Sequence, residues 1–314
     1  MTAAEVGTTY RFVMRRLPPL VIAIMLVLTG WVGTAAAVGR NDLVAYRGLG
    51  TWVDVNDYVP AFQQNGRKPA VTTRTFDRMA DRGVKTVYLQ GSEVDARAPG
   101  NTIDPKLLGR MLRAAHDADL RVVAWYLPRF ADVDADFRRV RALLDFKSDG
   151  ERFDGFALDI EANKSEPDVG RRNNALVDLS QRVRERAGNR PVGAIVLEPV
   201  FLEVVSPDFW PAFPWRQLKP LYDVWLPMSY WTNRNADSGY REGFRYTDEN
   251  IRRLRNNLGD EKAPVHAIGG IGDSAQTKDY VGFVRAAKKD DAIGWSIYDY
   301  STTVSTAWPR LRKG

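Results

Sequence analysis

Apolar runs of strand length recur along the chain from residue 43 onward, and segments with a helical spacing of apolar residues separate them. The runs are rich in Val, Ile, Leu and aromatic residues. Most of them lack the apolar–polar alternation of a half-exposed strand, which indicates burial on both faces, as in a parallel sheet. The strands predicted in this way are Tyr46–Val53, Thr86–Gln90, Arg121–Leu127, Gly155–Glu161, Val192–Glu198, Val224–Tyr230, Val265–Ile271 and Ala292–Tyr298.

Helical patterns occupy the intervals between these strands. In Asp104–Ala118, for example, Leu108, Met111 and Leu112 recur at helical spacing. Eight strands alternating with helices predict an α/β protein with a single (β/α)8 TIM barrel, and a doubly wound open sheet is the alternative. The long link Pro199–Tyr222 is predicted to form a lid or a wall. The other predicted helices are Ala175–Arg186, Asp248–Asn257, Thr277–Lys288, 73–82 and 136–146.

The beginning of the chain has the pattern of a targeting segment. Arg11, Arg15 and Arg16 precede an uncharged stretch, 17–38, with an apolar centre and small residues near its end. This pattern is typical of an export signal, and its length also suffices to span a bilayer with the basic side in the cytoplasm. The sequence therefore predicts three parts: a cytoplasmic basic region 1–16, a signal peptide or transmembrane anchor 17–38, and an extracytoplasmic barrel domain 42–314, either secreted or membrane-anchored.

Charge and composition narrow the chemistry of the barrel. The net charge is +6, the basic residues are scattered, and we find no nucleic-acid-binding motif. The basic surplus predicts a solvated surface, and attraction to an anionic cell wall or membrane surface is the alternative. The chain has no cysteine and only two histidines, which excludes disulfides and a cysteine nucleophile and argues against a histidine-rich metal site. We expect no metal and no cofactor.

A pair of acids closes the fourth predicted strand. Because side chains alternate along a strand, Asp159 and Glu161 point to the same side. Their apolar neighbours Phe156, Leu158 and Ile160 point to the other side and suit an outer layer beneath helices. The two carboxylates are thus predicted to share the inner face, where repulsion raises the pKa of one of them. A carboxylic acid that keeps its proton near neutral pH is what glycoside cleavage requires, and an ion-pair role with barrel arginines is the alternative.

Other polar and aromatic residues follow the predicted strands at their carboxyl ends, where the active sites of TIM barrels lie. Acids and aromatic rings on one rim are typical of a sugar site, because rings stack on pyranose faces and carboxylates bind hydroxyl groups. Structural roles are the alternatives: Asp54 could cap the following turn, and Trp295 could fill the barrel. Tyr230 could pack at the rim, and Glu198 could be solvent-exposed. The candidates are Asp54, Gln90, Glu93, Arg129, Glu198, Tyr230, Trp231, Trp295 and Asp299.

These segments resemble the chitinase-like family of glycoside hydrolases, family 18. That family carries Asp-Gly-x-Asp-x-Asp-x-Glu at the end of strand four, and residues 154–161 follow the pattern with Ala157 in place of one Asp. Its strand six carries Met-x-Tyr-Asp, which Met228 and Tyr230 match, whereas Trp231 replaces the Asp. The strand-four positions that match are Asp154, Gly155, Asp159 and Glu161.

The resemblance implies a cleavage reaction assisted by the substrate. Glu161 would protonate the leaving glycosidic oxygen, and Asp159 would orient the N-acetyl group of the substrate, which attacks the anomeric carbon. Tyr230 would hydrogen-bond the acetamide oxygen as charge develops there. Trp295 would correspond to the strand-eight tryptophan that floors the sugar site of the family.

The function predicted from the sequence is an exported or membrane-anchored glycoside hydrolase. Its partner would be a polysaccharide, such as an N-acetylated cell-wall glycan, and the membrane if residues 17–38 are not cleaved; nucleic acid is not expected. The departures at Ala157 and Trp231 favour the alternative, a non-catalytic glycan-binding barrel at the cell surface. A weaker resemblance is to other barrel glycosidases with paired acids at strand four, including lysozyme-like cell-wall hydrolases. The predicted substrate-binding residues are Asp54, Gln90, Glu198, Trp231 and Trp295.

Overall fold

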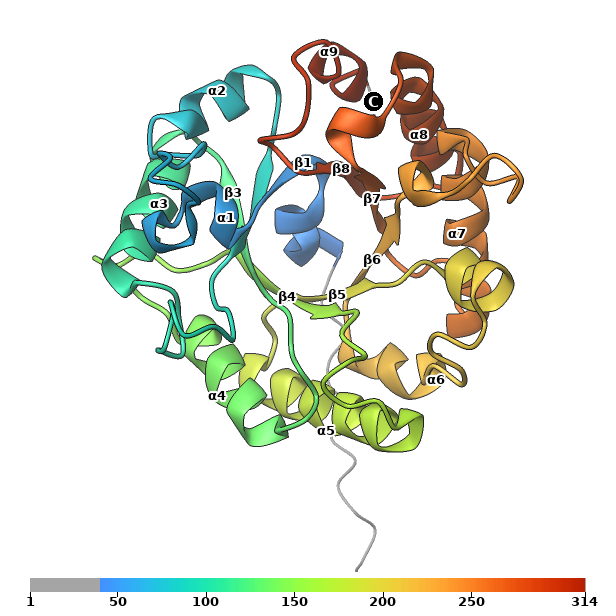
Figure 1. Ribbon diagram of the computed structural model, residues 1–314, viewed down its shortest axis with the longest axis horizontal. Helices are drawn as coiled ribbons and strands as arrows, with labels where there is room; N and C mark the ends of the chain where they lie inside the picture. The colour runs from blue at the N-terminus through green and yellow to red at the C-terminus, as the bar shows by residue number, and fades with distance from the viewer. Residues whose placement is uncertain (1–39, 314) are drawn as a thin grey trace, which may run out of the picture. The chain divides into compact units, whose positions relative to one another are not determined.

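The computed structural model describes residues 40–313, and within them eight parallel strands close into a barrel (Figure 1). Each strand pairs with the next one along the chain, and β8 returns to β1 with Ser296 opposite Gly50. Closure confirms the predicted barrel and rules out the open sheet. The strands are β1 (Gly48–Val53), β2 (Thr86–Gln90), β3 (Arg121–Tyr126), β4 (Gly155–Ile160), β5 (Val192–Val196), β6 (Val224–Ser229), β7 (His266–Gly270) and β8 (Gly294–Tyr298).

Helices connect the strands and surround the barrel (Figure 1). Asp104, Asp132 and Asp168 begin three of them by accepting backbone N–H groups of the first turn. The α-helices are α1 (Val55–Tyr58), α2 (Thr75–Asp81), α3 (Pro105–Asp117), α4 (Val133–Leu144), α5 (Val169–Ala187), α6 (Trp215–Leu218), α7 (Gly243–Leu258), α8 (Thr277–Lys289) and α9 (Trp308–Leu311). Shorter helical turns are η1 (Arg40–Tyr46), η2 (Pro60–Phe62), η3 (Phe201–Val205), η4 (Lys219–Leu221), η5 (Trp231–Asn233) and η6 (Gly272–Ser274).

Helix α5 begins at Val169, earlier than the predicted start at Ala175. Its first turn buries Arg172, whose guanidinium lies 4.3 Å from the ring centroid of Trp210. A buried arginine gives no apolar signal, so the spacing of apolar residues could not show this turn. Trp210 belongs to the link Pro199–Tyr222 and is itself buried. This part of the link is therefore a packed wall over the start of α5.

The interior of the barrel is filled by aromatic rings and a short polar chain. Trp52 stacks on Tyr88 with ring centroids 4.3 Å apart, and its Nε1 donates to Oγ of Ser296 over 2.8 Å. Nε2 of His266 lies 3.0 Å from the same hydroxyl, and burial lowers the pKa of this histidine to about 4, so its ring is neutral at pH 7. The interior is a packed core, which leaves the two ends of the barrel for chemistry.

Tyr46 closes the N-terminal end of the barrel. Its hydroxyl donates to the carbonyl oxygens of Phe156 (2.7 Å) and Pro191 (3.3 Å), at the beginnings of β4 and β5. Gly155 and Gly193 make room for the tyrosine, because a Cβ at these positions would lie 2.8 Å and 3.0 Å from its atoms. The described chain thus begins at the end of the barrel opposite to the carboxyl rim.

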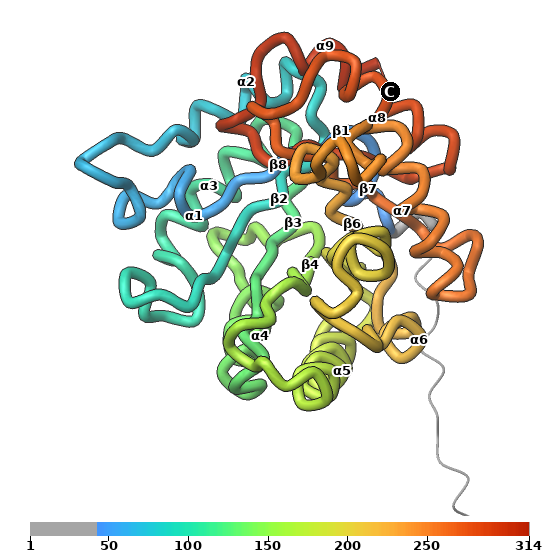
Figure 2. Tube along the Cα trace, turned by 45° about the vertical axis from the view of Figure 1, so that its right-hand side comes forward, coloured from blue at the N-terminus to red at the C-terminus, as the bar shows by residue number. Residues whose placement is uncertain are grey.

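The structure describes the C-terminal part of the chain through residue 313, whereas residues 1–39 lie outside the described range. The predicted targeting segment 17–38 lies outside the described residues, so it stays a prediction. No helix within residues 40–313 has the length and apolar character to cross a membrane. Near the C-terminus, α9 lies beside α8 (Figure 2), and the carbonyl oxygen of Leu311 in α9 accepts a hydrogen bond from Nε1 of Trp295 in β8.

Candidate functional site

The carboxyl end of β4 carries the two acids on the inner side of the barrel. Phe156, Leu158 and Ile160 are buried in the hydrophobic core, as the alternation of the strand predicts. Asp159, on the opposite parity, interacts electrostatically with Glu161. The strand therefore separates an apolar outer set from an acidic inner pair.

Both acids hold their protons more tightly than free carboxylates do. Asp159 is 7% exposed, and its Oδ1 has no hydrogen-bond partner within residues 40–313. Burial, together with the charges of Glu161 and Glu93, raises the pKa of Asp159 well above its ordinary value. Burial also raises the pKa of Glu161, which lies just past the end of β4. The environment at this end of β4 therefore favours the protonated form of both carboxyl groups.

Tyr230, which follows β6, lies close enough to the same two acids for their charges to affect its pKa. Burial raises the pKa of its hydroxyl well above the ordinary value, and the charges of Glu161 and Asp159 add to the effect. The ring lies against Gly270 at the end of β7, where a Cβ would approach Cδ1 of the tyrosine to 2.7 Å. Tyr230 therefore keeps a protonated hydroxyl next to the acidic pair, and the glycine is required for its position.

Tyr298, at the end of β8, belongs to the rim but was missed in the sequence. Its hydroxyl donates to Oδ2 of Asp54 over 2.8 Å, and its ring centroid lies 6.1 Å from that of Tyr230. Asp54 also caps α1, with Oδ1 accepting the N–H of Asn56 over 2.7 Å. The predicted capping role and a place at the rim are thus both found for Asp54. The hydroxyl of Ser296 faces the barrel interior, and Tyr298 lies two residues further along β8, on the same side of the strand. This spacing could have identified Tyr298 as an inward-facing residue.

Trp295 does not point to the rim. It has the parity opposite to that of Ser296 and Tyr298, and its Nε1 donates to the carbonyl oxygen of Leu311 in α9 over 3.0 Å. Its side chain therefore lies on the outer face of β8. The expectation that Trp295 floors a sugar site does not hold, because one step along a strand reverses the direction of the side chain.

Trp231 is likewise turned away from the acids. It is 1% exposed, and its ring centroid lies 5.3 Å from that of Phe283 in α8. A Cβ at Gly269 of β7 would lie 2.7 Å from its Cζ3. The tryptophan therefore packs between β7 and α8, and the expectation of a substrate contact is not met by its position.

Gln90 and its neighbours form a polar group beside Asp159. Nε2 of Gln90 donates to Oε2 of Glu93 over 2.8 Å, and its Oε1 accepts the N–H of Val55 over 3.0 Å. Nη2 of Arg129 donates to Oε1 of Glu93 over 3.2 Å. Gln90 is only 3% exposed, so it mainly holds Glu93 in place. The negative charge of Glu93 in turn contributes to the raised pKa of Asp159.

Glu198, after β5, is buried rather than exposed. Its Oε1 accepts the hydroxyl of Tyr246 over 2.8 Å, and Nη2 of Arg234 lies 3.7 Å away. Burial raises the pKa of Glu198 to about 7, and the nearby charge of Glu161 contributes in the same direction. Arg234 is the second rim residue that the sequence did not reveal. Its guanidinium also lies 5.0 Å from the ring centroid of Phe201.

Three acids beside β1 and β8 come close enough together to hold a cation. Carboxylate oxygens of Asp54, Asp57 and Asp299 lie within 4.8 Å of one another, and such ligands suit a hard divalent ion. Local hydrogen bonds already account for these groups, since Asp57 accepts the N–H of Asp54 and Asp299 accepts from Ser301 and Thr302. Burial and the other two charges raise the pKa of Asp57 to about 7.

The barrel is similar to solved structures of carbohydrate-cleaving enzymes. An endo-β-1,4-mannanase from Thermotoga petrophila has a TM-score of 0.60 and 12% identity, over 86% of this chain and 76% of its own. A class V chitinase from Pseudomonas fluorescens Pf-5 has a TM-score of 0.59 and 11% identity, over 85% and 99%. The spore cortex-lytic enzyme SleL of Bacillus cereus has a TM-score of 0.58 and 8% identity, over 84% and 73%. No family model and no curated protein matches the sequence. At these identities the likeness shows a shared fold, a closed (β/α)8 barrel.

Proposed function

We propose that the chain is a glycoside hydrolase that cleaves a polysaccharide at the carboxyl rim of the barrel. The observation that carries the proposal is the pair formed by Asp159, buried on the inner side of β4, and Glu161, half-buried just past the strand end, with the pKa of each raised. Ion pairing would lower these pKa values, so their direction argues against a purely structural role. Acids whose pKa values are raised by burial and by a neighbouring like charge are concentrated at catalytic sites.

In this proposal Glu161 is the general acid. It lies past the end of the strand and is more accessible than Asp159, so it can reach a glycosidic oxygen at the rim. Burial raises the pKa of Glu161, which shifts the group toward the protonated form that a general acid requires. Loss of such an acid typically slows a reaction by about 10²–10⁴-fold.

The neighbouring groups favour a nucleophile supplied by the substrate. A nucleophilic carboxylate must be ionised, whereas burial raises the pKa of Asp159 well above its ordinary value and that of Glu198 to about 7. An acetamido sugar carries its own nucleophile, the acetamide oxygen, and this is the route of the family 18 enzymes that the sequence resembles. Asp159 would orient the acetamide, and the hydroxyl of Tyr230 would stabilise the charge that develops on it.

The fold and the sequence together support the choice of substrate class. The similar structures include enzymes named for mannan and for spore cortex, which supports a polysaccharide substrate. The predicted targeting segment 17–38 supports a site of action outside the cytoplasm. An N-acetylated cell-wall glycan satisfies both conditions and supplies the acetamide.

Binding without cleavage is the second candidate, and Ala157 is the observation in its favour. This residue is fully buried beneath Asp159, where the family has a further acid, so no third carboxylate shares the proton of Asp159. A barrel of this kind could retain the sugar surface and lose turnover.

The deciding experiment incubates the full chain with a panel of polysaccharides and measures new reducing ends. We expect release from an acetamido glycan, and its loss in Glu161→Gln, which keeps the shape and removes the proton. Glu185→Gln, an exposed position on α5, is the matched control and should cleave normally. Glycan binding without reducing ends in the unmodified chain would establish the second candidate instead.

A further inference from the structure

The N-terminal end of the barrel carries an open hollow of about 580 Å³, far from the rim acids in the fold. Arg152 lies in the turn before β4, and Arg190 lies just before β5. Arg186 belongs to the last turn of α5, and Asp145 ends α4. Three arginines and one aspartate therefore line a single concave surface, which we call the arginine hollow.

The positive charge of the hollow is only partly compensated. Asp145 pairs with Arg186 over 2.5 Å. Within residues 40–313, no carboxylate lies within ion-pair distance of Arg152 or Arg190. The next acids along the turn, Glu151 and Asp154, are both engaged by His116. Burial and the neighbouring arginines lower the pKa of Arg190, as expected for cations crowded together.

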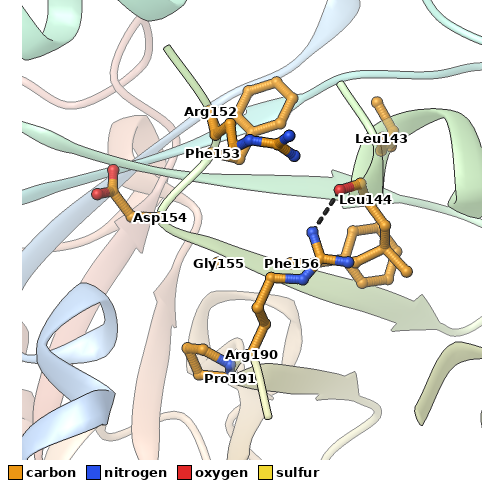
Figure 3. Close-up of a pocket in the computed structure, with 9 residues that line it drawn as sticks. All are labelled: Leu143, Leu144, Arg152, Phe153, Asp154, Gly155, Phe156, Arg190 and Pro191. Atoms are coloured by element: carbon orange, nitrogen blue, oxygen red, sulfur yellow. Dashed lines mark hydrogen bonds between the residues drawn. The ribbon is translucent and has the colours of Figure 1, made fainter. Parts of the chain in front are cut away.

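Hydrogen bonds to the backbone hold Arg190 in place within the hollow. The guanidinium of Arg190 donates to the carbonyl oxygen of Leu144, as the dashed line in Figure 3 shows, and its Nε donates to Ala187 over 3.2 Å. Beneath it, Phe153 and Phe156 line an apolar slot of about 40 Å³ (Figure 3). The guanidinium of Arg190 is thus held by backbone hydrogen bonds before a partner binds, which lowers the entropy lost on binding.

The short connection between residues 17–38 and η1 indicates which partner the arginine hollow binds. Helical turn η1 begins at Arg40 and ends with Tyr46, which is bonded at the beginnings of β4 and β5, beside the hollow. The apolar stretch 17–38 ends only two residues before Arg40 in the sequence. Two residues span at most about 7 Å, so a stretch entering a bilayer would bring lipid close to this end of the barrel.

We propose that the N-terminal end of the barrel docks on an anionic phospholipid surface, with Arg152, Arg186 and Arg190 against the headgroup phosphates. Arginine suits this partner because its planar guanidinium binds phosphate in a bidentate manner. β4 runs from the hollow to the acids, so the rim with Glu161 opens away from the lipid. A docked barrel therefore presents its candidate active site to the surroundings of the membrane.

The absence of cysteine allows a direct test on the full chain. A single cysteine replaces Asn189, which is exposed beside the hollow, or Asp237, which is exposed near the rim as the matched control. Each variant is labelled with an environment-sensitive dye and mixed with vesicles of phosphatidylcholine alone or with added phosphatidylglycerol. We expect a blue shift and quenching by headgroup quenchers only at position 189, only with phosphatidylglycerol, and less at high salt.

Charge variants connect this signal to the arginines. Arg152→Gln with Arg186→Gln should weaken docking about 25-fold, since each basic residue near a lipid surface contributes about fivefold. Arg152→Lys with Arg186→Lys keeps the charge and should retain most of the docking. Lys164→Gln with Arg171→Gln removes the same charge from the region before and at the start of α5, and should leave docking unchanged. Equal signals at positions 189 and 237, equal signals in the two lipids, or full docking by the glutamine pair would overturn the proposal. So would a shift produced by soluble polyphosphate and not by vesicles.

Discussion

The hydroxyl of Tyr298 donates a 2.8 Å hydrogen bond to Oδ2 of Asp54, which joins the last strand of the barrel to the cap of α1. The bond closes the rim at the seam between β8 and β1. It also places an aromatic ring beside Tyr230, 6.1 Å away between centroids. The seam residue is thus positioned to fix one wall of the candidate site.

Replacing Tyr298 with Phe should affect turnover more than stability. We expect a loss of about 0.5–1.5 kcal/mol in the free energy of unfolding, which is the usual net contribution of one hydrogen bond. Release of Asp54 at the rim should lower kcat on the best glycan as well. Tyr240→Phe, which removes a bond to Glu249 on α7, is the control and should change stability alone. Equal turnover in both variants would remove Tyr298 from the site.

Replacing Trp295 with Phe should leave glycan affinity unchanged. The side chain lies on the outer face of β8 and holds Leu311 of α9 through one hydrogen bond. We therefore expect a loss of about 1 kcal/mol in the free energy of unfolding, measured by denaturant titration. Loss of glycan binding in a stably folded variant would restore Trp295 to the site and contradict the observed direction of its side chain.

The outcome for Trp295 shows which parts of the structure the sequence could predict. All eight strands can be predicted from the sequence because buried parallel strands form continuous apolar runs. The end of the fourth strand then places Asp159 and Glu161 at the carboxyl rim. Side-chain direction is harder to read in a strand such as β8, where apolar and aromatic residues occupy both parities. Tyr298 was therefore overlooked in favour of the larger Trp295. The direction of a side chain beyond a strand end depends on the conformation of the following turn, and turn η5 places Trp231 between β7 and α8.

Stability should fall with increasing pH because of Asp159. The pKa of this group is raised far above its ordinary value of 3.8, so the folded chain keeps a proton that the unfolded chain releases. The stabilising effect of this proton is complete below the unfolded pKa and is lost as the pH rises toward the folded one. Asp159→Asn should therefore raise the free energy of unfolding at pH 7 by about 1–3 kcal/mol and flatten its pH dependence. Asp208→Asn, at an exposed position, is the control for chemical denaturation across pH. An unchanged pH profile in the Asp159 variant would mean that this carboxylate is ionised.

His116 should give a second pH dependence in the same direction. It lies between Glu151 (2.6 Å from Nδ1) and Asp154 (3.1 Å from Nε2), and these partners raise its pKa above the ordinary 6.5. Its stabilising effect is complete below the unfolded pKa and is lost as the pH rises through the folded value. His116→Gln should cost about 1 kcal/mol at pH 5.5 and less at about pH 9, by thermal unfolding. An equal cost at both pH values would assign the loss to packing.

The proposed role of the substrate acetamide gives the most specific prediction. If Asp159 and Tyr230 act on that group, a thiazoline analogue of the cyclised intermediate should inhibit strongly, because catalysts bind intermediates and transition states more tightly than substrates. Asp159→Ala should lower kcat with little change in KM. Tyr230→Phe should cost about 2.7–4 kcal/mol in transition-state stabilisation, by analogy with the loss of one oxyanion donor. These effects are measured on one acetamido glycan, and an unmodified glycan of the same linkage serves as the control. Efficient cleavage of the unmodified glycan, insensitive to the thiazoline, would leave the reaction in need of a protein nucleophile. Glu198 and Asp54 are then the first carboxylates to replace.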